Sequence, residues 1–323
     1  MQISGNHKTL INFRTKLLCW FFWLMKVFTN QKQFIHNPIL RSKILNRLGL
    51  HVFRILMAYF CTTVRRFLLS FKIPKEDRVF FKRNGFIIKE NFLPSEEYQA
   101  LKKIIGELTD FNAITFDGDT KLQKISLTRV QRANNIKFQF KNNPRYINLL
   151  KYVASKNCPF SFTINKVVSG HYDPQTTYHT DTFHPTMKSW LYFNNISADE
   201  GPFAYFPGSH KLTLKRLILE YKISNDLYSG KFLQATGGSC RYTEENLKWL
   251  GLTEVKLFIV KENTLVIADT FGVHRRTPSK PNTERNSLNS YHRILWPFSI
   301  LTGYKTEYFT DLSRRIYFSI FKY

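Results

Sequence analysis

The segment Tyr178–Pro185, which reads YHTDTFHP, is the part of the chain around which we expect the fold to be organised. Within it, His179 and Asp181 are two positions apart, so on an extended backbone both side chains point to the same face. An imidazole and a carboxylate placed in this way can share one metal ion, and His274 would supply a second imidazole from a distant strand. Two imidazoles and one carboxylate leave coordination positions open and suit non-haem Fe(II). Because HxD triplets also occur by chance, this interpretation depends on the rest of the chain.

Short alternating stretches separated by turn residues dominate the chain after Pro159. We predict strands at 160–168, 189–193, 203–206, 255–260, 264–268 and 289–296, a helix at 212–228 and a polar insertion at 234–246. Many short strands with turn signals between them are typical of a β-sandwich or barrel. A short strand at 86–88 and helices at 95–108 and 146–154 precede them, whereas residues 111–140 give no clear pattern. The sequence therefore predicts an α+β fold with a mainly β core flanked by helices.

The composition is that of a folded and strongly basic protein. Its 323 residues are 43% hydrophobic and 16% aromatic, too much for a disordered chain, and 48 Lys and Arg outnumber 23 Asp and Glu. This excess permits acidic partners, such as anionic lipid or an anionic small molecule. There is no run of more than two basic residues, no zinc-finger spacing and no RNP-like motif, so we expect no nucleic acid. The four cysteines form no CxxC pair, which favours a reducing, cytoplasmic compartment.

Residues 1–80 carry fourteen Lys or Arg and two Asp or Glu, so nearly half of the net charge lies on a quarter of the chain. Residues 14–28 predict a helix whose apolar run of nine residues is too short to span a bilayer. In a second predicted helix at 47–71, Arg47, Arg54 and Arg65 fall near one face. Such segments suit either a membrane surface or helices that pack on the domain with snorkelling arginine stems. We predict a basic, amphipathic helical extension at 1–80 and a main domain at 81–323.

Further motifs follow YHTDTFHP along the chain: WLY at 190–192, NIS at 195–197, GP at 201–202, PGSH at 207–210, TLVIADTFGVHRR at 264–276, and Arg285. Together with NGFII at 84–88, this ordered series resembles the phytanoyl-CoA dioxygenase family of Fe(II)- and 2-oxoglutarate-dependent oxygenases. The resemblance covers roughly residues 81–298 and leaves residues 1–80 outside it. It implies a double-stranded β-helix, the jelly-roll or cupin-like fold, flanked by helices.

The resemblance also implies which residues form the site. His179, Asp181 and His274 would bind Fe(II), with 2-oxoglutarate as cosubstrate and O2 as co-reactant. Arg285, eleven residues after His274, matches the arginine that binds the distal carboxylate of 2-oxoglutarate. A planar guanidinium suits this role because it binds a carboxylate through two hydrogen bonds and stays charged when it is buried.

Three further residues are expected near 2-oxoglutarate. Trp190 matches a tryptophan that lines the cosubstrate pocket. Arg129 matches a basic residue that also contacts 2-oxoglutarate, at a position where the family often has lysine. Ser287, on the same strand face as Arg285, would add a hydroxyl donor. Outside the site we expect structural or substrate-facing histidines and solvated arginines: His184, His210, Arg275, Arg276 and Arg293.

The identity of Asp181 bears on the reaction. Related halogenating enzymes have Gly or Ala at this position, which opens a site for chloride, whereas a carboxylate fills it. The resemblance therefore implies hydroxylation of a C–H bond in a small-molecule or lipid-like substrate, with conversion of 2-oxoglutarate to succinate and CO2. We expect the insertion at 211–250 to cover the substrate. The alternative is a non-catalytic membrane-surface or interaction protein on a degenerate oxygenase fold, which the basic residues 1–80 would serve.

Overall fold

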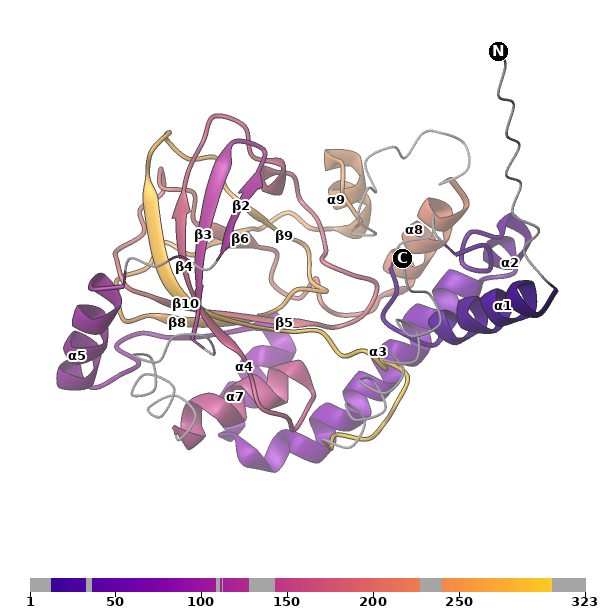
Figure 1. Cartoon of the computed structure of the whole chain (residues 1–323), viewed down its shortest axis with the longest axis horizontal. Helices are drawn as coiled ribbons and strands as arrows, with labels where there is room; N and C mark the ends of the chain where they lie inside the picture. Colours follow the sequence, from indigo (N-terminus) through magenta and orange to yellow (C-terminus); the bar gives the residue numbers. More distant parts are fainter. Residues whose placement is uncertain are drawn as a thin grey trace, which may run out of the picture.

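The core of the protein consists of two antiparallel β-sheets that face each other (Figure 1). The computed structural model describes residues 13–32, 37–108, 111, 113–127, 143–226 and 240–303. The larger sheet has the strand order β1-β8-β5-β10-β4-β3-β2, and the smaller sheet has the order β7-β6-β9. The strands of the larger sheet are β1 (Phe86–Lys89), β2 (Ala113–Asp117), β3 (Thr120–Ser126), β4 (Phe162–Val168), β5 (Met187–Tyr192), β8 (Leu265–Asp269) and β10 (Glu284–His292). Those of the smaller sheet are β6 (Phe203–Tyr205), β7 (Lys256–Leu257) and β9 (His274–Arg276).

Strand β8 shows how the sequence fills both faces of the larger sheet. Its five residues are all buried, because each face of the strand meets another layer. Leu265 and Ile267 pack among the helices on the outer face. Val266 and Ala268 point the other way and pack against Phe258, next to the smaller sheet. Because both faces are covered, β8 does not show the alternation of apolar and polar residues that a strand with one exposed face shows.

Helices cover the outer face of the larger sheet, with α3, α4 and α7 below it in Figure 1. The helices are α1 (Phe13–Val27), α2 (Lys43–Arg47), α3 (Leu50–Leu69), α4 (Lys75–Asn84), α5 (Ser95–Gly106), α7 (Pro144–Ala154), α8 (Leu214–Asp226) and α9 (Glu244–Leu250), with short 3-10 turns η1 (Ser70–Lys72) and η3 (Pro174–Thr176). Asn143 caps α7 by accepting a hydrogen bond from the backbone N–H of Tyr146 at 3.0 Å. Tyr146 and Leu149 of α7 are fully buried against the sheet.

The arginines of α3 lie inside the protein. Arg54 is buried and donates hydrogen bonds to the carbonyl oxygens of Val27 (2.9 Å), Thr29 (3.0 Å) and Gln31 (2.9 Å), which hold the end of α1. Arg65 is buried too and donates to carbonyl oxygens of the segments at residues 155 and 297, whereas Arg47 is exposed. Burial lowers the pKa of Arg54 to about 9. One face of α3 therefore packs on the domain, as one of the two alternatives predicts, and contact of its exposed face with a membrane stays a prediction. The division into 1–80 and 81–323 stays a prediction.

None of the helices in the described ranges is long and apolar enough to cross a membrane.

The predicted fold class, a mainly β core flanked by helices, is confirmed, and two facing antiparallel sheets are the arrangement of a double-stranded β-helix. The predicted strand at 289–296 was wrong in its bounds, because β10 runs from Glu284 to His292 and so contains Arg285. The predicted strand at 255–260 shrinks to the two residues of β7. The stretch without a clear pattern holds the β2–β3 hairpin, whose β2 is largely exposed and therefore lacks hydrophobic alternation.

Candidate metal centre and cosubstrate pocket

Backbone pairing brings the three predicted metal ligands together. His179 and His274 lie opposite each other in an antiparallel bridge and exchange two backbone hydrogen bonds, of 2.9 and 3.0 Å. The N–H of Asp181 donates to the carbonyl of Thr270 at 3.0 Å. The HTD segment is thus fixed against the chain that joins β8 to β9, and His274 begins β9.

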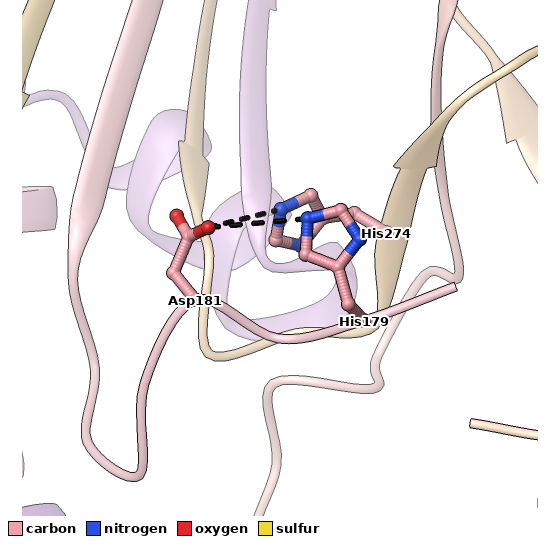
Figure 2. Close-up of side chains that lie close together, drawn as sticks. All are labelled: His179, Asp181 and His274. Atoms are coloured by element: carbon pink, nitrogen blue, oxygen red, sulfur yellow. Dashed lines mark ion pairs between the residues drawn. The ribbon is translucent and has the colours of Figure 1, made fainter. Parts of the chain in front are cut away.

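The three side chains converge on one point (Figure 2). One ligand atom from each of His179, Asp181 and His274 lies within 4.8 Å of the others. Asp181 Oδ1 is 3.7 Å from Nε2 of His274 and 4.0 Å from Nε2 of His179. Both imidazoles are buried, so few water molecules compete for the site.

Hydrogen bonds select the tautomer that a metal requires. Nδ1 of His179 lies 2.7 Å from the carbonyl oxygen of Thr177, and Nδ1 of His274 lies 2.8 Å from that of Gly272. A carbonyl can only accept, so each Nδ1 carries a proton, and Nε2 is the nitrogen that the neutral form of each ring offers to a metal. Burial, and then the nearby His274, lower the pKa of His179 to about 3, so its ring is neutral. Nε2 of His274 is buried without a hydrogen-bond partner, as expected of an atom that binds a metal.

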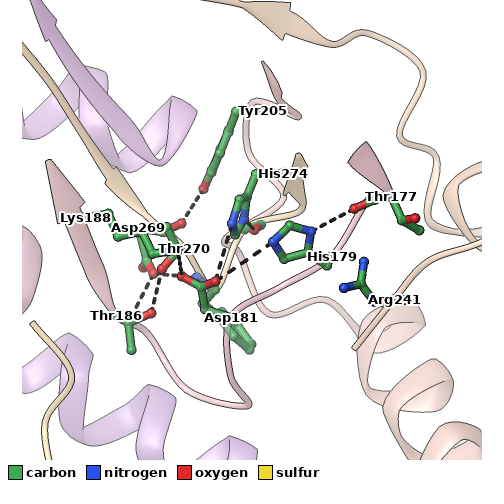
Figure 3. Close-up of polar contacts among 12 residues, drawn as sticks. Thr177, His179, Asp181, Thr186, Lys188, Tyr205, Arg241, Asp269, Thr270 and His274 are labelled. Carbon is green, nitrogen blue, oxygen red and sulfur yellow. Dashed lines mark hydrogen bonds and ion pairs between the residues drawn. The ribbon is translucent and has the colours of Figure 1, made fainter. Parts of the chain in front are cut away.

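Two lysines hold the carboxylate ligand in place (Figure 3 shows one of them, Lys188). Lys188 Nζ lies 2.7 Å from Asp181 Oδ2, which leaves Oδ1 facing the imidazoles. Burial alone would raise the pKa of Asp181, but Lys188 and the two histidines outweigh it and hold this pKa well below its usual range. Lys32, between α1 and α2, donates to the backbone carbonyl of Asp181 at 2.8 Å. Neither lysine was among the residues expected at the site.

Asp269, at the end of β8, supports the loops that carry the ligands (Figure 3). It is fully buried, and its carboxylate accepts hydrogen bonds from the backbone N–H groups of Thr186 (3.2 Å) and Phe271 (3.0 Å). Arg66 of α3 pairs with the same carboxylate at 2.9 Å, and the hydroxyl of Tyr205 donates to its backbone carbonyl at 2.9 Å. The sequence analysis did not single out Asp269, because its burial and its distant partner Arg66 appear only in the fold.

A cavity of about 490 Å³ adjoins the three ligands and lies between the two sheets. Arg285 and Ser287 line it from β10, and Trp190 lines it from β5, where its ring packs on Phe203 with centroids 4.7 Å apart. Ser287 lies opposite Tyr192 of β5 and is buried. The cavity therefore contains the candidate ligands together with three of the residues expected to contact the cosubstrate.

Arg285 is buried with an unused charge. Within the described residues no carboxylate pairs with it, and its Nη2 has no hydrogen-bond partner. Burial, and then repulsion from Arg276, lower its pKa to about 10, which still leaves it protonated at neutral pH. Gly201 has a φ of +68°, and a Cβ there would lie 2.9 Å from Nη1 of Arg285, so a glycine leaves room for the guanidinium. A buried, unpaired guanidinium calls for an anionic ligand.

The remaining predicted residues lie in different places. Arg129 falls outside the described residues. His184 and His210 are buried away from the triad, which is consistent with structural roles. The prediction that the arginines after His274 are solvated was wrong. Arg276 pairs with Asp173 and lies 3.7 Å from Asp117, and Arg275 stacks on the Tyr178 ring at 4.2 Å.

Comparison with known proteins gives one family and several structures. Residues 81–225 match the family model described as phytanoyl-CoA dioxygenase, a range that includes His179 and Asp181 but ends before His274 and Arg285. No curated protein matches the chain.

Among solved structures, EctD from S. alaskensis with bound Fe is 14% identical with a TM-score of 0.49, covering 72% of this chain and 82% of that one. The epimerase SnoN in complex with Fe3+, alpha ketoglutarate and nogalamycin RO is 14% identical with a TM-score of 0.47, covering 67% and 82%. HygX from Streptomyces hygroscopicus with nickel and 2-oxoglutarate is 13% identical with a TM-score of 0.42, covering 68% and 86%. All three TM-scores lie below 0.5.

Proposed function

We propose that this chain, whose residues 81–225 match the phytanoyl-CoA dioxygenase family model, is an Fe(II)- and 2-oxoglutarate-dependent dioxygenase that hydroxylates a C–H bond. The observation that carries the proposal is the convergence of two buried imidazoles and one carboxylate within 4.8 Å. This donor set fits Fe(II), because two imidazoles and a carboxylate on one face leave the opposite positions free.

Different residues would bind the metal and the cosubstrate. His179, Asp181 and His274 would bind the iron, and Lys188 would keep one carboxylate oxygen turned towards it. Arg285 would take the distal carboxylate of 2-oxoglutarate. When bound, Fe(II) with 2-oxoglutarate and O2 supplies an oxidant for C–H hydroxylation, with succinate and CO2 as co-products. The protein's own share is to bind, orient and exclude water from these groups.

The lining of the cavity supports a small polar substrate over a lipid-like one. Polar side chains of β3, β4 and β10 line part of the cavity, namely Lys124, Thr163, Asn165 and Asn289. The side-chain oxygens of Asn165 and Asn289 are buried and accept no hydrogen bond, so a ligand with N–H or O–H groups would satisfy them. Lys124 has no carboxylate partner within the described residues, which leaves a cation for an anionic group. In the described part of the chain, no lining residue comes from residues 1–80.

The test is succinate release by the purified full chain. We expect release that requires Fe(II), 2-oxoglutarate and O2 together, and that falls to background in His179→Ala. Phe116→Ala, which removes an exposed side chain on β2, serves as the control and should keep the wild-type rate. A metal-loaded protein that neither binds nor decarboxylates 2-oxoglutarate would refute the proposal and favour the alternative of a binding protein on a degenerate oxygenase fold.

We also propose a cytoplasmic protein that is peripheral at a membrane surface through residues 1–80. The support is the net charge of these residues, together with the large apolar side chains that α1 and α3 expose. Such a location is compatible with a polar substrate, since the cavity and the exposed helices occupy different parts of the molecule.

A further inference from the structure

Helix α3 reverses the usual amphipathic arrangement, because its exposed face carries no charge and its charged residues point into the protein. Its charged and titratable residues point inwards: His51, Arg54 and Arg65 are buried, and Arg66 is half-buried and pairs with Asp269. The exposed face instead presents large apolar side chains, the most exposed being Phe67 (75%) and, just beyond the helix, Phe71 (77%). The full set is Phe53, Leu56, Met57, Phe60, Phe67, Leu68 and Phe71. Phe53, Phe60, Phe67 and Phe71 are spaced by seven, seven and four residues, and the others flank them, so the set forms one stripe along a helix about 30 Å long.

The one polar residue exposed on this face does not interrupt the stripe. Thr63 donates its hydroxyl to the carbonyl of Tyr59 within the helix at 2.9 Å, so its polar group is already satisfied. A stripe of this size on a water-exposed helix marks an interaction site, because single-domain proteins rarely leave contiguous apolar patches in solvent.

Helix α1 adds a second face of the same kind. Its described exposed side chains, with Phe28 just after the helix, are all apolar: Leu18, Trp20, Phe21, Leu24, Met25 and Phe28. Arg54 ties the end of α1 to α3 through three carbonyl oxygens. Figure 1 shows α1, α2 and the first half of α3 at the same end of the molecule, away from the strands. We call the exposed apolar side chains of α1 and α3, with Phe28 and Phe71, the docking face.

The charge around the docking face indicates which occupant it takes. Residues 1–75 contain no Asp or Glu at all. Arg41, Lys43 and Arg47 are exposed beside α2, and none has a carboxylate partner within the described residues. Lys72 lies 5.7 Å from the centre of the Phe71 ring, at the end of the stripe. Tryptophan and phenylalanine flanked by uncompensated cations match the chemistry of an anionic bilayer surface.

We infer that the docking face binds an anionic lipid bilayer, with its aromatic side chains at the boundary of headgroups and acyl chains and Arg41, Lys43 and Arg47 on the headgroups. The protein would lie on the membrane rather than span it. This inference does not rest on the oxygenase activity, because it uses none of the residues that line the cavity.

The experiment is co-sedimentation of the full chain with vesicles of phosphatidylcholine alone and of phosphatidylcholine with phosphatidylserine. We expect binding to the mixed vesicles, weakened by salt, and a loss of at least about tenfold in the double variant Phe60→Ser, Phe67→Ser. Ile259→Ser is the matched control, since Ile259 is comparably exposed (56%) but lies outside α1 and α3. Neutralising Arg41, Lys43 and Arg47 to Gln should weaken binding to the mixed vesicles selectively.

Three results would overturn the inference. One is a wild-type chain that sediments with neither vesicle, or equally with both. Another is a double variant that sediments like the wild type. The third is a vesicle-free wild type that light scattering shows to be a dimer and the double variant a monomer, because a second copy would then cover the docking face. Circular dichroism checks folding, and Phe53→Ser, Phe71→Ser replaces the first pair if that pair unfolds. Succinate release measured on the same samples separates this outcome from failure of the oxygenase proposal.

Discussion

Lys188 is the residue whose side chain most directly controls the orientation of Asp181. Replacing it by Met removes the ion pair while keeping most of the volume. Because groups that orient a ligand typically account for a factor of about 10–100 in metal affinity, we expect Lys188→Met to weaken binding by that factor. Titration with Co(II), followed by its visible absorption, measures this. Lys280→Met, which breaks an exposed pair with Asp199, is the control and should leave the affinity unchanged. Equal affinities in wild type and Lys188→Met would contradict an orienting role.

Arg285 differs from the other cavity cations because it is buried and unpaired. We expect Arg285→Gln to weaken 2-oxoglutarate binding by about 2–5 kcal/mol, the usual effect of removing one partner of a buried charge pair. Arg285→Lys should recover only part of this, since lysine keeps the charge but loses the two-pronged geometry. Calorimetric titration under anaerobic conditions gives the affinity, with the exposed Arg145→Gln on α7 as control. Unchanged binding in Arg285→Gln would place the cosubstrate elsewhere.

At the scale of elements, the arginines of α3 test whether this helix is part of the fold or an appendage. Arg54→Met should lower the free energy of unfolding by about 2–5 kcal/mol, because three carbonyl oxygens lose their donor. Arg47→Met lies just before the same helix, is exposed, and should stay within about 0.5 kcal/mol of wild type. Urea denaturation followed by circular dichroism compares the two. Equal stabilities would mean that α1 and α3 are held together by other contacts.

The elements also show how much of the fold and of the candidate site could be predicted from the sequence. The order of short strands was predictable, because turn residues and apolar alternation are local signals. The triad was predictable because the HTD spacing and the apolar strand before His274 are local as well, and Arg285 followed from its place in the ordered motifs. Lys32 and Asp269 were not, since each acts through a partner far away in sequence. Lys188 lies seven positions after Asp181, but their contact depends on the course of the loop between them, which the spacing does not show. The buried arginines of α3 were equally hidden, because helical spacing shows that residues share a face but not which face is covered.

At the scale of the whole molecule, a buried ionic cluster joins the N-terminal helices to the rest of the protein. Glu220 of α8 lies 3.1 Å from His51 of α3 and 3.1 Å from Arg216 of its own helix. Burial alone would raise the pKa of Glu220, but the hydrogen bond from His51 and the charge of Arg216 outweigh it and lower this pKa to about 2. A pKa below the ordinary value of 4.5 means that the ionised group stabilises the fold above pH 4.5 and that this contribution is lost as the pH falls towards 2.

We therefore expect wild type to lose stability between pH 4.5 and 2 more steeply than Glu220→Gln, which has no charge to lose there. At neutral pH the variant should be the less stable of the two, and the two curves should converge near pH 2. Urea denaturation midpoints over this range measure the effect. Glu244→Gln, at the exposed start of α9, should follow the wild-type curve. Parallel curves for wild type and Glu220→Gln would show that this carboxylate contributes no pH dependence.

The hydrogen bond from Lys32 to the backbone of Asp181 links residues 1–80 directly to the candidate metal site. Lys32 lies five positions after Val27, which Arg54 holds, so a displacement of α1 would reach the segment that carries a candidate metal ligand. A bilayer that binds the docking face would then be an allosteric effector, because thermodynamic reciprocity requires that the factor by which adsorption changes metal affinity equals the factor by which the metal changes adsorption. Metal-free and Co(II)-loaded protein should partition differently between buffer and vesicles, whereas equal partitioning would mean that the two events are energetically separate.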